Sequence, residues 1–275
     1  MRIRLIIFLT LTLFLLSCSK DKELYKPTVK LDPYQIYKEG LDGFKNNQYF
    51  FASKKFAEAE INFTSPEAAA KSAIMNSFSL YAINFYDEAE ESLNRYLKVY
   101  PADKYKIYAH YLLAIISYEQ IGDERHDLKP LLDAREKIDF FLNEYPNSEY
   151  AIDLNLKNDL VTNQFAAREL YIAKYYIKVQ KWVPAINRLK IIVKDYSRTI
   201  FIEEALHRLV EIHYHVGLED EAKNFAAILG YNYNSSEWFK QSYKILNKNY
   251  DFKKKVKSKK DKTLFKKIID KIKLD

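Results

Sequence analysis

A spacing of large and small apolar residues recurs along the chain and constrains its fold more than any other feature. In each copy a large side chain is followed by alanine three residues later, by a second large side chain four residues further on, and by another apolar residue after three more. Because residues three and four apart share one face of an α-helix, each copy predicts one helix with a buried face. The alanines of the five copies, the last of which is the weakest, are Ala52, Ala89, Ala134, Ala185 and Ala222.

Small residues also occur on the segment before several copies, at Gly40, Ala114 and Ala173. Two helices of a hairpin can cross closely only where side chains are small, and large residues on either side then fill the space between hairpins. This pattern is similar to the tetratricopeptide repeat, whose unit is about 34 residues. Successive alanines are 37, 45, 51 and 37 residues apart, so longer segments between repeats are expected, notably at residues 122–130. The prediction is an all-α tetratricopeptide-repeat superhelix of about five helical hairpins at residues 33–250. An ordinary helical bundle is the alternative, but a bundle does not need to repeat this register.

Composition agrees with long helices joined by short connections. The 275 residues include only 5 Gly and 7 Pro, against 23 Tyr and 17 Phe, so turns are few. One cysteine, Cys18, excludes an internal disulfide, and stability must come from packing.

The first 18 residues read as an export signal. Arg2 and Arg4 precede an apolar run at residues 5–16, which is too short for an ordinary membrane span, and Ser17 and Cys18 follow. This arrangement resembles the bacterial lipobox, which implies a signal peptide at residues 1–17, acylation of Cys18 and a tether at residues 18–32. The residue after the cysteine is Ser19, and not the aspartate that is associated with retention in the inner membrane of enteric bacteria. By this resemblance we expect a protein that is lipid-anchored to the periplasmic face of the outer membrane. An ordinary signal peptide with a chance cysteine, or an uncleaved membrane segment, is the alternative.

Positive charge is concentrated in the C-terminal tail. The net charge is +7, but residues 252–275 carry 11 Lys and 3 Asp, and residues 19–251 are mildly acidic at −3. This distribution does not favour a nucleic-acid-binding surface. Residues 251–275 are predicted to form a basic amphipathic tail, either an interfacial helix on an anionic leaflet or a helix docked on a partner. A solvated tail is the alternative. The apolar positions that fall on one helical face are Leu264, Phe265, Ile268, Ile269 and Ile272.

Four segments resemble the BamD family, the lipoproteins of the outer-membrane β-barrel assembly machine. They are residues 145–153 (Tyr-Pro-Asn-Ser-Glu-Tyr-Ala-Ile-Asp), 173–176, 182–189 and 203–206, and the resemblance covers about residues 33–240. It implies a non-catalytic scaffold that docks on the POTRA region of a BamA-type barrel subunit through its C-terminal repeats. It also implies that the N-terminal repeats receive the C-terminal targeting segments of unfolded outer-membrane proteins, with other assembly lipoproteins as further partners. Another periplasmic tetratricopeptide adaptor, in envelope synthesis or secretion, is the alternative.

The resemblance and the repeat register suggest two sets of site residues. Arg188 matches a motif position that implies a contact with an acidic residue of the POTRA region, for which a forked guanidinium is suited. Without the resemblance, Arg188 could equally cap helix carbonyls or cover its own core. The first helix of each unit should face the concave groove, where rings would contact the aromatic end of a targeting segment and lysines its carboxylate. An error of one residue in the register would exchange the faces. The predicted groove residues are Tyr37, Leu41, Phe44, Lys45, Lys71, Phe78, Tyr81, Tyr111 and Tyr118.

No enzyme signature emerges from the sequence. It contains neither a glycine-rich phosphate loop nor a Gly-x-Ser-x-Gly elbow. His207, Glu211 and His215 are spaced by four and could chelate a metal on one helix face, but a solvated polar face is favoured. We therefore expect no enzymatic activity, no cofactor and no metal.

Overall fold

The computed structural model describes residues 32–247, in which every regular element is an α-helix and no strand occurs. Cys18, the tether before residue 32 and the basic tail lie outside the described residues. The described helices are α2 (Pro33–Lys45), α3 (Tyr49–Asn62), α4 (Pro66–Tyr81), α5 (Tyr86–Val99), α6 (Lys106–Glu119), α7 (Lys129–Glu144), α8 (Ala151–Lys178), α9 (Trp182–Asp195), α10 (Ile202–His215), α11 (Glu219–Asn232) and α12 (Glu237–Leu246).

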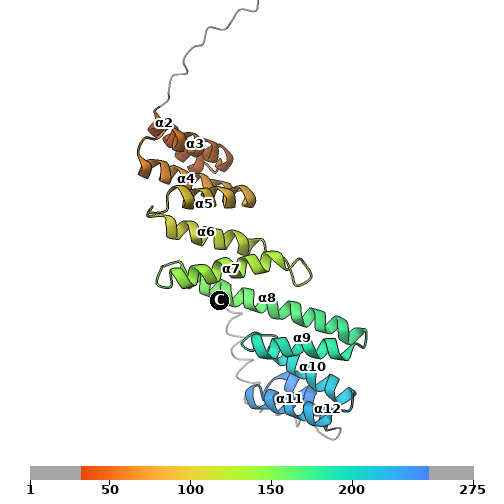
Figure 1. Ribbon diagram of the computed structural model, residues 1–275. Helices are drawn as coiled ribbons and strands as arrows, with labels where there is room; N and C mark the ends of the chain where they lie inside the picture. Colours follow the sequence, from red (N-terminus) through yellow and green to blue (C-terminus); the bar gives the residue numbers. More distant parts are fainter. Residues whose placement is uncertain (1–31, 248–275) are drawn as a thin grey trace, which may run out of the picture.

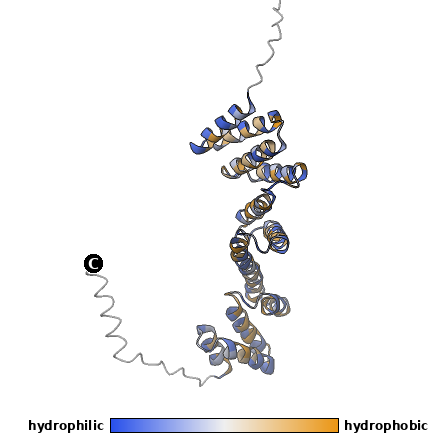
Figure 2. Cartoon of the chain, turned by 90° about the vertical axis from the view of Figure 1, so that its left-hand side faces the viewer, coloured by the Kyte–Doolittle hydropathy of each residue, from blue (hydrophilic) through white to orange (hydrophobic). Residues whose placement is uncertain are grey.

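The helices pack as five successive hairpins, α2/α3, α4/α5, α6/α7, α8/α9 and α10/α11, and α12 packs on the last of these. Figure 1 shows them stacked in layers, and Figure 2 shows the same layers from the side as a gently curved column. First helices also contact one another directly, α4 with α6 and α6 with α8, which places them toward the inner side of the curve. Within residues 32–247 the prediction of an all-α array of five hairpins is confirmed.

Small residues lie at every hairpin crossing. All five repeat alanines are fully buried. A Cβ atom added at Gly40 would lie 2.9 Å from two ring carbons of the buried Phe56, so α2 and α3 approach too closely for a larger residue. Gly40 precedes Ala52 by 12 residues, and two buried residues that the sequence did not identify, Ser77 and Val210, precede their alanines by the same interval. Ser77 also hydrogen-bonds across its crossing to Ser92, with 2.8 Å between the hydroxyl oxygens.

A left-handed residue closes four of the five hairpin turns, each time five residues before the repeat alanine. The φ angles are 59° at Asn47, 60° at Asn84, 57° at Gln180 and 84° at Gly217. This conformation lets a helix end and the chain reverse within about three residues, and it favours Gly or Asn.

The third hairpin has a different connection. Residues 120–128 lie between α6 and α7, so the expectation that the segment at 122–130 joins two repeats is wrong. The turn is replaced by a longer loop inside the hairpin, which α8 holds in place. Gln164 donates to the Gly122 carbonyl at 3.0 Å, and Arg168 donates to the His126 carbonyl. The other long interval, before Ala185, arises because α8 has 28 residues.

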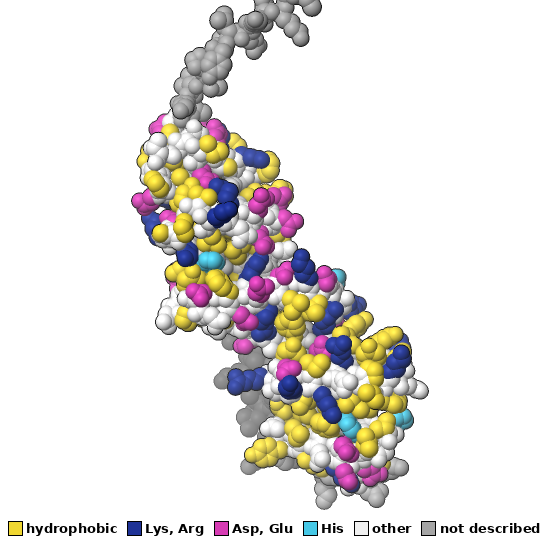
Figure 3. All heavy atoms as spheres, in the orientation of Figure 1, with side chains coloured by type: hydrophobic (Ala, Val, Ile, Leu, Met, Phe, Trp, Pro, Cys, Tyr) yellow, Lys and Arg dark blue, Asp and Glu magenta, His cyan; other side chains and the backbone are white. Residues whose placement is uncertain are grey.

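The face shown in Figure 3 carries charged side chains of both signs with apolar groups between them. Among the described helices, none combines the length and the apolar character that crossing a bilayer requires.

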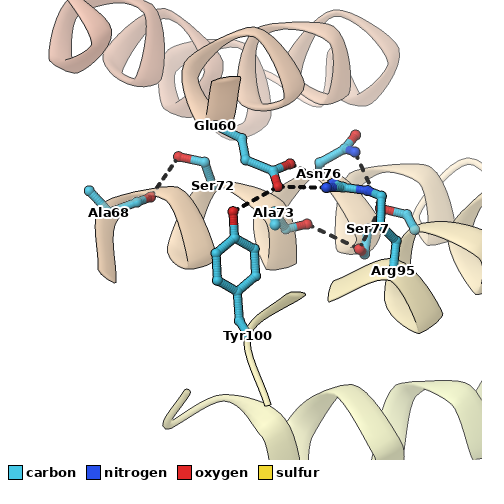
Figure 4. Close-up of polar contacts among 9 residues, drawn as sticks. Glu60, Ala68, Ser72, Ala73, Asn76, Ser77, Arg95 and Tyr100 are labelled. Atoms are coloured by element: carbon cyan, nitrogen blue, oxygen red, sulfur yellow. Dashed lines mark hydrogen bonds and ion pairs between the residues drawn. The ribbon is translucent and has the colours of Figure 1, made fainter. Parts of the chain in front are cut away.

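An ion pair between a buried glutamate and a partly exposed arginine ties the first hairpin to the second (Figure 4). The Glu60 carboxylate at the end of α3 accepts hydrogen bonds from Arg95 of α5 at 2.7 and 2.5 Å, and from the Tyr100 hydroxyl at 3.0 Å. Burial and this carboxylate together raise the pKa of Tyr100 to about 12. Three donors on one carboxylate satisfy a charge that would otherwise be costly to bury.

Gly217→Ala should lower the free energy of unfolding by about 1 kcal/mol, since the alanine must adopt a left-handed conformation. A Cβ atom there would meet nothing within 4 Å, so the loss reports backbone conformation alone. Urea unfolding followed by circular dichroism measures it. Gln180→Gly, at the equivalent turn, serves as the control and should cause no loss. Equal stability of Gly217→Ala and the natural chain would contradict this account of the turns.

Candidate functional site

Six aromatic side chains from four successive units form a continuous row, which we call the aromatic row. The centroids of neighbouring rings are 5.7 Å apart for Phe44 and Phe78, 6.4 Å for Phe78 and Tyr108, and 4.6 Å for Tyr111 and Tyr150. Every ring is partly exposed. The row therefore packs along its length while still presenting ring surface to a ligand. Its members are Phe44 from α2, Phe78 and Tyr81 from α4, Tyr108 and Tyr111 from α6, and Tyr150 at the start of α8.

The structure brings four of the predicted groove residues into this row and leaves the others beside it. Tyr37 packs instead on Phe56, with 5.3 Å between ring centroids, and Leu41 is half-buried on α2. Tyr118 lies near the far end of α6, where the Lys157 ammonium is 5.3 Å from its ring. The sequence analysis missed two members of the row, which are Tyr108 and Tyr150. A signal for Tyr108 was present, because it lies one helical turn before a predicted residue.

Carboxylates of the same chain accept hydrogen bonds from two tyrosines of the row, Tyr81 and Tyr111. Tyr81 and Tyr86 donate to Glu119 at 2.8 and 2.9 Å, and Tyr111 donates to Asp153 at 2.9 Å. Burial, followed by the hydrogen bond to Asp153, raises the pKa of Tyr111 to about 12, and Tyr81 is shifted in the same direction by burial and Glu119. These hydroxyls stay protonated at neutral pH and remain engaged, so Tyr81 and Tyr111 offer ring faces rather than hydrogen-bond donors.

Two lysines predicted for the groove lie close to its N-terminal end. The Lys71 ammonium is 5.7 Å from the centroid of the Tyr37 ring, and Lys45 is exposed in the last turn of α2. Within residues 32–247 neither ammonium forms an ion pair. Both are therefore available to a carboxylate of a ligand.

Arg188 lies on α9, whose inward residues Ala185, Leu189 and Ile192 are fully buried as expected. Its Nη1 atom is 3.1 and 3.2 Å from the two carboxylate oxygens of Glu169 on α8. The side chain is 40% exposed. Arg188 is thus paired within its own chain, a contact that the sequence did not indicate, and the guanidinium carries further N–H donors beyond Nη1.

The histidine-rich face of α10 differs from the expectation. The sequence pattern favoured a solvated polar face for His207, Glu211 and His215. This prediction is wrong for His207, whose side chain is 2% exposed. Its Nδ1 lies 2.9 Å from the Ser242 hydroxyl and its Nε2 lies 3.4 Å from Glu211. α12 covers this face, which a single helix pattern cannot reveal. The described residues contain no group of three or more potential metal ligands.

The family model that matches this chain and its curated relatives agree with one another. The family model named YfiO and described as an outer membrane lipoprotein matches residues 30–228. The outer membrane protein assembly factor BamD of Rickettsia prowazekii is 34% identical over 215 residues, which cover 78% of this chain and 85% of that protein. The BamD of Caulobacter vibrioides is 34% identical over 227 residues, which cover 82% and 74%. Among solved structures, a tetratricopeptide protein of Thermus thermophilus aligns with a TM-score of 0.35 and 15% identity, covering 78% of this chain and 99% of that one; likeness at this level carries no inference.

Proposed function

This chain belongs to the BamD (YfiO) family of outer membrane lipoproteins, and on that basis we propose that it binds both the targeting segments of unfolded outer-membrane proteins and the POTRA region of a BamA-type barrel subunit. The family is one of outer membrane protein assembly factors, which are scaffolds rather than enzymes, in agreement with the sequence-based expectation. The two contacts are assigned to different parts of the array, the peptide to the first three units and the barrel subunit to α9.

The observation that carries the peptide proposal is the aromatic row, together with the unpaired lysines Lys45 and Lys71 on the first two units. Targeting segments of barrel proteins end in an aromatic residue and a free carboxylate, as the resemblance to BamD implies. Phe44 and Phe78 provide ring faces for that aromatic residue, and Lys71 and Lys45 provide charge for the carboxylate. Because the row is already packed in place, binding needs little ordering of the protein.

Photo-crosslinkers at Tyr37, Phe78 and Tyr111 should capture a peptide that ends in phenylalanine with a free carboxylate. Matched controls are Glu88 and Leu132, which are exposed side chains on the second helices α5 and α7 and are not members of the row. An amidated peptide should be captured less, because the lysines then lose their partner. Capture at the control positions but not along the row would show that the assignment is wrong.

The docking proposal concerns Arg188. Its side chain lies at the surface of α9, and its pair with Glu169 holds the guanidinium in one place. An acidic residue of the barrel subunit would then share the guanidinium with Glu169 or replace it. A positioned, partly exposed arginine is suited to bidentate recognition of a carboxylate.

Arg188→Glu should weaken binding to the barrel subunit tens-fold or more, because a repulsive contact replaces a charge pair that the interface buries. Helix content and melting temperature should change little, since exposed ion pairs contribute less than about 1 kcal/mol. Arg188→Gln removes the positive charge without placing a second carboxylate beside Glu169, so it controls for misfolding of Arg188→Glu. It should also weaken binding. Glu169→Gln, which keeps the arginine but loses the pair that positions it, should weaken binding less than Arg188→Glu does. Surface plasmon resonance on the purified partner measures all three, and normal binding by Arg188→Glu would refute the docking proposal.

The membrane attachment proposed at Cys18 lies outside the described residues and rests on the sequence pattern. Acyl chains on this residue would hold the array at the outer membrane, since each buried CH₂ contributes roughly 0.8 kcal/mol. Mass spectrometry of the mature N-terminus should find Cys18 acylated, and Cys18→Ala should leave an unprocessed or released protein. An unmodified thiol on the mature protein would exclude lipidation.

A further inference from the structure

Large aliphatic side chains remain exposed along the N-terminal half of α8. Ile152 is 80% exposed, Leu156 is 61% exposed and Leu160 is 47% exposed. They are four residues apart and so follow one another along one side of the helix. The fully buried Leu154 and Val161 face the core, which leaves this series pointing outward.

The turn between α9 and α10 extends the apolar surface. Ile200 is 80% exposed, and its backbone N–H donates to the Asn163 side chain of α8 at 3.2 Å. A pocket of about 520 Å³ is lined by Leu160 and Ile200, together with Phe201 and Glu119. We call Ile152, Leu156, Leu160 and Ile200 the α8 stripe. A contiguous apolar surface of this kind marks an interaction site, since burying each such side chain contributes about 1.5–3 kcal/mol.

Carboxylates lie beside the part of the stripe on α8. Asp159 lies on the same side of α8 as the stripe by helical spacing, and Glu149 lies just before α8; both are exposed, and neither forms an ion pair within residues 32–247. Asp153, at the edge of the stripe, is paired with Lys157 at 2.7 Å. The stripe is therefore suited to an occupant that is apolar on one side and basic on the other.

We propose that the α8 stripe is the docking site of this chain's own C-terminal segment, residues 264–275. Five apolar residues of that segment fall on one helical face, and lysines surround them. The first and the last of the five, Leu264 and Ile272, are eight positions apart. Ile152 and Leu160 are also eight residues apart, so each apolar series would extend ~12 Å along a helix. Residues 264–275 carry 4 Lys and 2 Asp, a net charge of +2, and the connecting residues 252–263 carry a net charge of +6, so both complement the carboxylates beside the stripe.

The connecting chain is long enough to make this contact. Ile245 of α12 lines a pocket with Tyr214 and His215, so α12 ends near the end of α10. Ile200 lies just before the start of α10. At 1.5 Å per residue, the two ends of α10 are ~20 Å apart, so Ile200 lies about that far from the end of α12. Residues 248–263 can span up to ~53 Å when extended. A tether of this length gives the segment a high effective concentration at the stripe, so modest affinity suffices.

The docked segment would lie next to the aromatic row. Tyr111 of the row donates to Asp153, which borders the stripe, and Tyr150 immediately precedes α8. The tail therefore shields the stripe from water and borders the peptide-binding surface. The docking itself does not depend on the proposed function.

A photo-crosslinker at Ile268 of the full chain tests the contact. Mass spectrometry should map its products to residues 152–163 or to Ile200 within the same molecule. In a second measurement, Leu156→Asp should speed tryptic cleavage at Lys266, Lys267 and Lys271 several-fold, because the released segment becomes accessible. Leu132→Asp, at a 48% exposed leucine of α7, is the matched control and should leave cleavage unchanged.

Three results would overturn the proposal. The first is equal cleavage of the natural chain and Leu156→Asp without crosslinks to α8. The second is crosslinking only between two copies of the chain. The third is protection of the tail solely by vesicles of phosphatidylethanolamine and phosphatidylglycerol, to the same extent in Leu156→Asp, which would assign the segment to a lipid surface. Since both substituted leucines are largely solvent-exposed, circular dichroism should confirm that each variant keeps its fold.

Discussion

The two helices of each hairpin cross closely, and this close crossing sets the geometry of the whole array. Gly40 shows how tight it is, because even one added carbon would lie 2.9 Å from the Phe56 ring. At the other crossings a fully buried alanine takes the same role on the second helix. Helices held this closely act as one rigid layer, and each layer buries its apolar faces against the next. The left-handed residue five positions before the alanine keeps the turn short enough for the crossing to form.

The candidate binding surface is a consequence of this stacking. Because first helices contact one another from α4 to α8, rings that are far apart in sequence become neighbours. Phe44, Phe78 and Tyr108 come from three different units, yet their rings form one row. Glu119 and Asp153 then fix the tyrosine hydroxyls and leave the ring faces available. A surface assembled from rigid layers in this way suits a scaffold, which must present a ready contact to many peptides.

The sequence pattern predicted the features that are set within a single helix, and it missed those that are set by contacts between two helices. The alanine register identified the second helix of every unit, since a small residue among large ones is a strong local signal. Ser77 and Val210 were missed because neither residue type by itself suggests a close crossing. Tyr150 precedes α8, where helical periodicity has not yet begun. The pairing of Arg188 with Glu169 requires the relative rotation of α8 and α9, and the burial of His207 requires the position of α12, neither of which a single helix pattern contains.

The proposed function makes this array the scaffold on which a β-barrel assembly machine engages its substrates. Affinity purification of the tagged chain from detergent-solubilised envelopes, followed by mass spectrometry, tests it most directly. We expect a barrel protein with POTRA domains to be recovered in amounts comparable to the chain itself. Recovery of a different stable partner, such as an envelope-synthesis or secretion complex, without any such barrel protein would contradict it.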